Sequence, residues 1–352
     1  MIPTHPPQSS DDAALSRREF LGRGARFTIA VGVGSACMSG ATPAEAAGPL
    51  VKFSHGTGLC NMPLFYAGET KLFAKYGANA EVVLTVPGTA TIQLASGQVE
   101  MAVLPYTSAI AAYTRSPGFS VISGSGIQGL MVVAKPGLKS FADLKGKKVG
   151  AQQADTLDIM LYDYMKKHGM TYKDVQMQYI ADTFELSNAF IAGQLDAIAI
   201  IEPYATKCKT ATGGSFLGDG IDMYGQGYPD CALLAQKKVI EKEPELVKNV
   251  IRAFFDAEYQ IETNIEEAAK LMVGKYYKTD MASLLSAAKA QPPGVDIRDK
   301  REFMFGRAKS MRELNYISKD PDQDFVNFKL LEAVIKESPE LWKRVKVHSK
   351  MS

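Results

Sequence analysis

Hydroxyl, amide and acidic side chains gather in the loops that follow the expected strands, where they could hold a small molecule. Asp155 and Glu202 are acids among them, and a carboxylate at such a place can bind an ammonium group or a ring nitrogen. Loop acids beside helix starts more often cap the helix or make a fixed structural bond. We expect the ligand-binding residues to be Thr57, Cys60, Asn61, Gly88, Thr89, Tyr106, Thr107, Ser125, Asp155, Thr156, Glu202 and Tyr204.

These loops are nearly free of Lys and Arg, so hydroxyls and helix N-terminal amides would have to hold any anionic group of a ligand. Tyr106 and Tyr204 occupy mirrored positions after two strands and are the predicted walls for a flat or apolar ligand.

Cys60 offers a second kind of chemistry, because a thiol in a loop before a helix can act as a nucleophile. His55 lies five residues away, but no motif fixes a His–Cys geometry, and a thiol that lines a pocket is the simpler interpretation. His55, Cys60 and Met62 without a second cluster are a weak metal signal. P-loop, dinucleotide, zinc and nucleophile-elbow motifs are missing, so we expect no enzyme, cofactor or metal.

A near-repeat predicts how these residues are positioned. Residues 92–107 recur as residues 189–204, and the second copy is two residues longer between its Gly and its Pro-Tyr. Each copy reads as a helical turn that ends at Gly, followed by a short strand that ends in Pro-Tyr. Two such copies indicate two lobes of similar construction that face a ligand cleft.

The apolar patterns of the sequence predict alternating strands and helices up to about residue 235 and mainly helices beyond it. This alternation predicts α/β lobes with mostly parallel sheets. The expected strands are 50–54, 81–86, 101–104, 119–123, 130–134, 147–151, 175–180 and 231–236, and the expected helices are 63–77, 108–113, 157–168, 183–192, 244–264, 265–277, 281–290, 300–314 and 324–336.

Residues 1–46 are typical of an export signal. Ser16-Arg17-Arg18 followed by Phe20 and Leu21 matches the twin-arginine pattern, and small residues at Ala44 and Ala46 predict cleavage after Ala46. The apolar stretch is too short to span a bilayer, so we expect a periplasmic protein exported by the twin-arginine route. A lipid anchor on Cys37 is a weaker alternative.

Composition narrows the function classes. The net charge is +2, which indicates neither nucleic acid nor a membrane surface as a partner. Cys60, Cys208 and Cys231 remain after the signal is removed; we expect Cys208 and Cys231, the nearer pair, to form any disulfide and Cys60 to stay free.

Over nearly its whole length the mature chain resembles the solute-binding proteins of ABC importers for nitrate, sulfonates, taurine and thiamin precursors, the NMT1/THI5-like group. The resemblance rests on residues 63–67, 72–77, 94–100, 140–149, 193–197 and 202–204. It implies a type II periplasmic-binding-protein fold, two doubly wound α/β lobes joined by two crossover strands. We place lobe I at 47–130 plus 235–352 and lobe II at 131–234.

Where members often carry Gly-Ser-Ser, this chain has Ala154-Asp155-Thr156, which removes small oxyanion ligands and adds an acid. The resemblance therefore implies a periplasmic binder of a small organic solute, either sulfonate- or taurine-like or heteroaromatic as a pyrimidine precursor is. It would act as a monomer and deliver its ligand to a permease in the inner membrane. The alternative is an enzyme on the same fold, similar to a desulfinase or a pyrimidine synthase, that uses Cys60.

Overall fold

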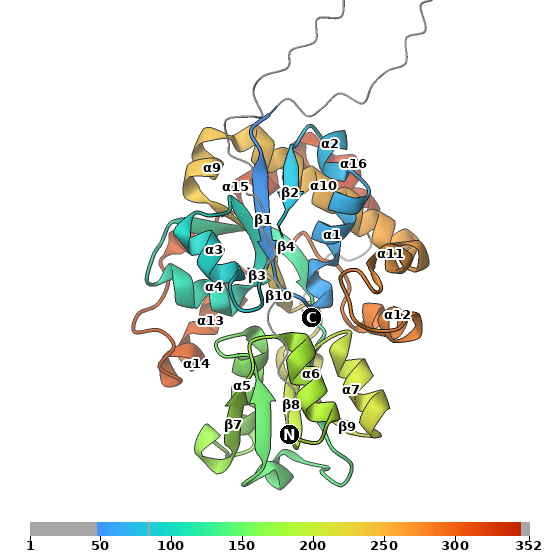
Figure 1. The fold of residues 1–352 in the computed structure, drawn as a ribbon. Coiled ribbons are helices and arrows are strands. Elements are labelled where there is room, and N and C mark those ends of the chain that lie inside the picture. Colours follow the sequence, from blue (N-terminus) through green and yellow to red (C-terminus); the bar gives the residue numbers. More distant parts are fainter. Residues whose placement is uncertain (1–47, 84, 346–352) are drawn as a thin grey trace, which may run out of the picture. The chain divides into compact units, whose positions relative to one another are not determined.

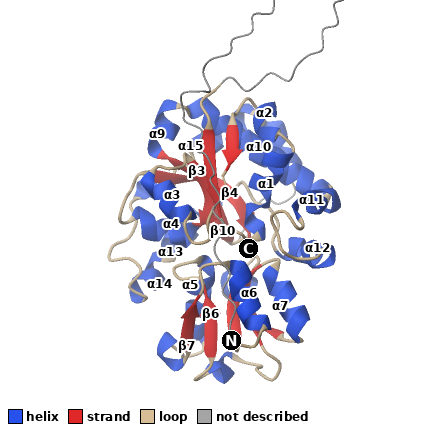
Figure 2. Ribbon diagram, in the orientation of Figure 1, coloured by secondary structure: helices blue, strands red, loops and turns tan. Residues whose placement is uncertain are grey.

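The computed structural model describes residues 48–83 and 85–345 of the chain. The predicted export signal, its cleavage after Ala46 and the Cys37 alternative all lie outside these residues. Two separate five-stranded sheets carry the fold, with strand orders β2-β1-β3-β10-β4 and β7-β6-β8-β5-β9 (Figure 1). Helices flank both sheets (Figure 2). This arrangement is the mixed α/β, two-lobe type II architecture that the sequence predicts.

The first sheet has three parallel strands and an antiparallel pair at its edge. β1 (Val51–His55) pairs in parallel with β2 (Ala80–Val82) and with β3 (Met101–Pro105). β10 (Pro229–Gln236) runs antiparallel between β3 and β4 (Phe119–Ile127). The helices between β1 and β4 in the chain are α1 (Met62–Glu69), α2 (Leu72–Lys75), α3 (Ala90–Ser96) and α4 (Tyr106–Tyr113).

The second sheet repeats the plan. β6 (Lys148–Ala151) pairs in parallel with β7 (Gln176–Tyr179) and with β8 (Ala197–Ile201). β5 (Leu130–Ala134) runs antiparallel between β8 and β9 (Ser215–Asp219). Its helices are α5 (Thr156–Lys167), α6 (Thr183–Ile191), α7 (Tyr204–Thr212) and α8 (Gly220–Tyr224).

The chain after β10 is helical, as predicted. α10 (Pro244–Thr263) is the longest helix and packs against α1, α2 and α15. The other C-terminal helices are α9 (Lys237–Lys242), α11 (Ile265–Met272), α12 (Met281–Ala290), α13 (Arg301–Gly306), α14 (Ala308–Glu313), α15 (Lys329–Glu337) and α16 (Pro339–Arg344).

Each sheet has its own hydrophobic core. Phe53 of β1 and Phe254 of α10 belong to one large cluster around the first sheet. The second sheet separates two smaller clusters, one containing Leu161 of α5 and the other Phe190 of α6. Burial of these apolar side chains, at about 25 cal/mol per Å², is the main stabilising term for each sheet.

Several predicted elements are shorter than expected. The helix predicted over 63–77 breaks at Lys71, whose φ of 58° is left-handed. The strand predicted over 81–86 ends at Val82, because Pro87 and Gly88 already belong to a turn. The helix predicted over 300–314 divides at Arg307, and α7 and β9 were not predicted as elements.

The predicted lobe boundaries at residues 130 and 234 stay a prediction. The chain passes from the first sheet to the second between Ile127 and Leu130, and it returns between Asp219 and Pro229. β10 pairs with β3 and β4 along its length, so residues 229–234 lie in the first sheet. Among the residues that the structure describes, no helix is long and apolar enough to cross a membrane.

Candidate functional site

A cavity of about 800 Å³ lies at the carboxyl ends of the parallel strands of both sheets. Its walls come from the loop after β1, the start of α4 and the loop after β6, among other segments. Open α/β sheets bind ligands at this edge, where loops and helix N-termini meet. The cavity is therefore the candidate binding site.

The loop after β1 is held by hydrogen bonds within itself. The Gly56 amide donates to Asn61 Oδ1 over 3.2 Å, and Asn61 Nδ2 donates to the Gly58 carbonyl over 3.1 Å. His55 Nδ1 lies 2.7 Å from the Gly56 carbonyl oxygen, and burial lowers the pKa of this imidazole. A neutral His55 thus adds no cation to the cavity wall at neutral pH.

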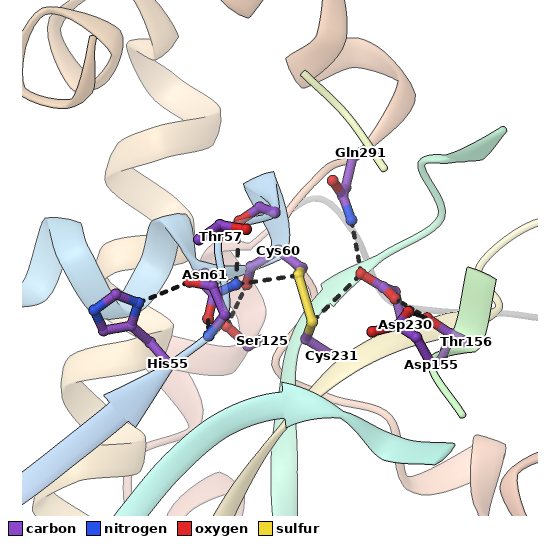
Figure 3. The surroundings of a disulfide bond; sticks show 12 residues. His55, Thr57, Cys60, Asn61, Ser125, Asp155, Thr156, Asp230, Cys231 and Gln291 are labelled. Atoms are coloured by element: carbon purple, nitrogen blue, oxygen red, sulfur yellow. Dashed lines mark hydrogen bonds between the residues drawn. A yellow bond between two sulfur atoms is a disulfide. The ribbon is translucent and has the colours of Figure 1, made fainter. Parts of the chain in front are cut away.

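A disulfide joins Cys60 of this loop to Cys231 of β10, with 5.7 Å between their Cα atoms (Figure 3). The prediction that Cys208 pairs with Cys231 and leaves Cys60 free is therefore wrong. Cys208 is the free, buried cysteine, and it lies on α7 beside the second sheet. Cys231 lies in the first sheet because β10 pairs with β3 and β4. Cys208 is nearer to it in sequence but packs beside the second sheet, whereas Cys60 lies next to it in space.

β4 packs against the loop after β1 through Ser125 and Gly126. Ser125 Oγ donates to the Cys60 carbonyl over 2.6 Å, and both residues are buried. A Cβ atom at Gly126 would lie 2.5 Å from Cys60 Cα, so only glycine admits this approach. Ser125 therefore positions Cys60 and does not line the cavity.

The loop after β6 ends in an acid that caps a helix. Asp155 is the N-cap of α5, and its Oδ1 accepts from the Leu157 amide over 3.1 Å. Removal from bulk water raises the pKa of Asp155 to about 6, although the bonds to Leu157 and Thr156 favour its charged form. The structural interpretation of Asp155 as a cap is thus correct, and the residue also lines the cavity.

Asp230, at the start of β10, lies beside Asp155 (Figure 3). Thr156 Oγ1 donates to Asp230 Oδ1 over 2.6 Å, and Gln291 Nε2 donates to Oδ2 over 2.9 Å. Asp230 is 1% exposed, and burial followed by repulsion from Asp155 raises its pKa well above the ordinary range. Asp155 therefore carries a negative charge at neutral pH, and Asp230 is the member of the pair that is harder to ionise.

Hydrogen bonds connect the two loop sets across the cavity. Thr57 Oγ1 donates to Thr183 Oγ1 over 2.7 Å, and Thr183 Oγ1 donates to Gln152 Oε1 over 3.2 Å. The Leu59 amide donates to the Glu202 carbonyl over 2.9 Å. The structure thus has the loops of the two sheets in contact.

The structure brings some of the predicted ligand-binding residues to the cavity wall and places others behind it. Five of them line the cavity: Thr57, Cys60, Asn61, Gly88 and Asp155. Seven do not: Thr89, Tyr106, Thr107, Ser125, Thr156, Glu202 and Tyr204.

Tyr106 and Tyr204 are not cavity walls, contrary to the prediction. Each is 2% exposed and is the first residue of its helix, α4 or α7. Tyr106 packs edge-on against Phe303, and Tyr204 packs edge-on against Phe184. β3 ends at Pro105 as predicted, whereas β8 ends at Ile201, before the Pro203-Tyr204 segment, and at both places the helix start turns the tyrosine ring into a hydrophobic core.

Three other predicted residues that do not line the cavity, Glu202, Thr89 and Thr107, either form hydrogen bonds with nearby residues or are buried in the interior. Glu202 accepts from the amide and the hydroxyl of Thr206 over 2.9 and 2.8 Å, so its carboxylate belongs to α7. Thr89 Oγ1 donates to the Val86 carbonyl over 2.7 Å, and Thr107 is fully buried.

Sequence reasoning missed Asp230 and Gln152 as lining residues. Asp230 sits among apolar residues at the start of a strand, where its direction cannot be read from the pattern. Of the described residues, one group has the ligand types of a metal site: Cys60, Cys231 and Asp230, with atoms within 4.8 Å of one another. Both sulfurs are used by the disulfide, so this group offers no thiolates to a metal.

Comparison with known protein families shows which family the chain belongs to. The family described as NMT1/THI5 like matches residues 61–263, which is more than half of the chain. The chain belongs to the NMT1/THI5-like family. The matched region includes the second sheet and every strand of the first sheet except β1.

Individual relatives agree with this family. A protein of Brucella abortus (strain 2308), named as a binding protein, is 29% identical over 227 residues, covering 63% of this chain and 70% of its own. The nitrate-binding protein NrtA from Synechocystis PCC 6803 superposes with a TM-score of 0.73 at 14% identity, over 84% of this chain and 91% of its own. The aliphatic sulphonate binding protein SsuA from Escherichia coli gives 0.67 at 17%, over 86% and 93%.

Proposed function

We propose that this protein is the periplasmic solute-binding component of an ABC importer and binds a small organic solute in its cavity. One observation carries the proposal: loops from the carboxyl ends of both sheets line a single cavity of about 800 Å³. A volume of this order suits a small organic molecule rather than a bare inorganic ion. Family membership and the names of the relatives support the same assignment.

The chemistry of the wall supports an organic solute of sulfonate, taurine-like or heteroaromatic type. Neutral donors such as Thr57, Asn61 and Ser108 alternate with apolar surface from Leu104 and Ile201. Among the lining residues that the structure describes, Arg115 is the one Lys or Arg, and its side chain is exposed. A bare oxyanion would have little cationic support in this cavity.

The delivery route is part of the proposal. Residues 1–46 would direct export by the twin-arginine route, with cleavage after Ala46. The mature chain would act as a monomer in the periplasm and pass its ligand to an inner-membrane permease.

An enzyme that uses Cys60 is less well supported. The Cys60 sulfur is bonded to Cys231, so the oxidised protein holds no thiolate at this position. Cys60→Ala separates the two functions, because a binder keeps its ligand affinity within a few fold and an enzyme loses turnover.

Thermal-shift and calorimetric titration against alkanesulfonates, taurine, nitrate, aminopyrimidines and aromatic acids tests the proposal. We expect at least one organic compound to bind one-to-one and to raise the melting temperature. Ala112→Phe, which fills the cavity, should abolish this binding, whereas Ala142→Phe at an exposed site should not. Tight binding of nitrate alone, or of no compound, would overturn it.

A further inference from the structure

The cavity contains an acidic end with no basic partner. Asp155 and Asp230 are the carboxylates among its described lining residues, and they lie side by side (Figure 3). Every hydrogen bond that these two acids accept comes from a hydroxyl, a side-chain amide or a backbone amide. The cavity therefore carries a negative charge that no Lys or Arg of this end neutralises.

The oxygen atoms of the pair are used unequally. Asp230 has one donor on each oxygen, Thr156 on Oδ1 and Gln291 on Oδ2. The Leu157 amide donates to Asp155 Oδ1 over 3.1 Å, and Thr156 Oγ1, whose proton points to Asp230, lies 3.1 Å from the same oxygen. Asp155 lines the cavity, and neither of these contacts uses its Oδ2.

The groups around Asp155 do not supply a cation either. Asp158, on the same helix, is itself an acid whose Oδ2 accepts from Tyr316 and from the Ala154 amide. Tyr106 of α4 is neutral because burial raises its pKa far above the physiological range. A carboxylate with one oxygen outside these contacts and acidic or neutral neighbours favours a positively charged partner.

We propose that the solute carries a protonated nitrogen, as an ammonium, an amidinium or a protonated amino-heterocycle, and donates a hydrogen bond from it to Asp155 Oδ2. This inference rests on the proposed function and narrows the solute class of the same cavity. Thr156 and Gln291 hold Asp230 in place behind Asp155, so Asp230 completes an acidic end that rejects anionic groups.

The proposal makes binding depend on protons. Protonation of Asp155 removes the charge that attracts the nitrogen, so affinity should fall as the pH drops below about 6. The groups that face Asp155 are Asp158 from α5, Asp230 from β10 and Tyr106 from α4, and none of them replaces the lost negative charge in that range.

Matched probe pairs test the inference. Taurine and isethionate differ in carrying an ammonium or a hydroxyl group, and 4-aminopyridine and pyridine differ in carrying a cation or a neutral ring at pH 7.5. Calorimetric titration of the mature protein should give a preference of about 10- to 100-fold for the nitrogen cation of at least one pair, the effect of one charge-assisted hydrogen bond. The preference for taurine over isethionate should shrink between pH 7.5 and pH 5, because neither probe changes its charge over this range and Asp155 does.

Asp155→Asn should abolish this preference, since an amide keeps the helix cap but not the charge. Asp182→Asn is the matched control, because Asp182 caps α6 in the same way but lies outside the cavity wall. Equal binding of both members of each pair, or an unchanged preference in Asp155→Asn, would overturn the inference and leave the proposed function standing. If no organic compound of either kind binds, the proposed function fails together with the inference.

Discussion

The loops after β1 and β6 hold equivalent places in the two sheets, because each follows a strand with parallel neighbours on both sides. The first loop is committed to its own structure through Asn61, the Cys60–Cys231 disulfide and the support of Ser125. The second loop ends at Asp155, which caps α5 with one oxygen and leaves the other out of that bond. The two loops follow equivalent strands but differ in role: the loop after β1 forms a fixed part of the cavity wall, and the loop after β6 supplies a group that can contact a ligand.

The largest effect should come from opening the disulfide that fixes the first loop. It closes a loop of 171 residues, and Cys231→Ser should lower the free energy of unfolding by about 4 kcal/mol, mainly by freeing the unfolded chain. Chemical denaturation with and without a reducing agent measures this change. Cys208→Ala should keep the response to the reducing agent, because Cys208 is outside the disulfide. Equal stability of the oxidised and reduced wild-type protein would contradict the account.

A smaller loss should follow from pushing the first loop away from β4. The added Cβ of Gly126→Ala would overlap Cys60, so we expect a loss of about 2–3 kcal/mol in urea denaturation. Gly306→Ala is the control, since a Cβ there meets nothing within 4 Å. If the two substitutions cost the same, the close packing of the first loop does not matter for stability.

A substitution in the second loop should stabilise the protein instead of destabilising it, because the buried Asp155 carboxylate costs folding free energy when it is charged. The pKa of Asp155 is raised to about 6 from 3.8, so this group's favourable contribution is complete below pH 4 and is lost as the pH rises through 6. Asp155→Asn should therefore stabilise the ligand-free protein by about 2 kcal/mol at pH 7.5 and by almost nothing at pH 3.5. Thermal unfolding at both pH values measures the difference, and a destabilised variant at pH 7.5 would refute the assignment.

The smallest effect concerns the hydrogen bonds that connect the two sides. Thr183→Val removes the bonds to Thr57 and Gln152 and should cost about 1 kcal/mol, whereas Thr183→Ser keeps the hydroxyl and should cost less. Urea denaturation of the ligand-free variants measures both. A loss in Thr183→Ser as large as that in Thr183→Val would contradict the account, because the hydroxyl would then contribute no more than the methyl group.

The sequence correctly predicts many of the strands and helices. Strands at 130–134 and 148–151 and helices at 183–191, 244–263 and 281–290 agree with their apolar patterns, Gly stops and caps. Each Pro-Tyr segment lies between a strand and the helix that begins at its tyrosine, so the near-repeat correctly predicts two similar units.

The parts that sequence reasoning missed depend on where side chains point and which distant strands pair. β10 returns to the first sheet and carries Asp230 and Cys231 to the cavity, a pairing that no local pattern reveals. Tyr106 and Tyr204 look like walls in the sequence because strand ends face the cleft, but the first helical turn buries their rings. Asp155 could be found because an N-cap and a cavity edge coincide at one residue.

The central claim is that a nitrogen cation of the solute meets Asp155 in a cavity between two sheets. Native mass spectrometry of the protein purified from its own host tests it most directly, because the accurate mass of a retained ligand gives its elemental composition. The account predicts one small organic molecule per chain with at least one basic nitrogen. A retained inorganic anion, or an organic anion without a basic nitrogen, would contradict it.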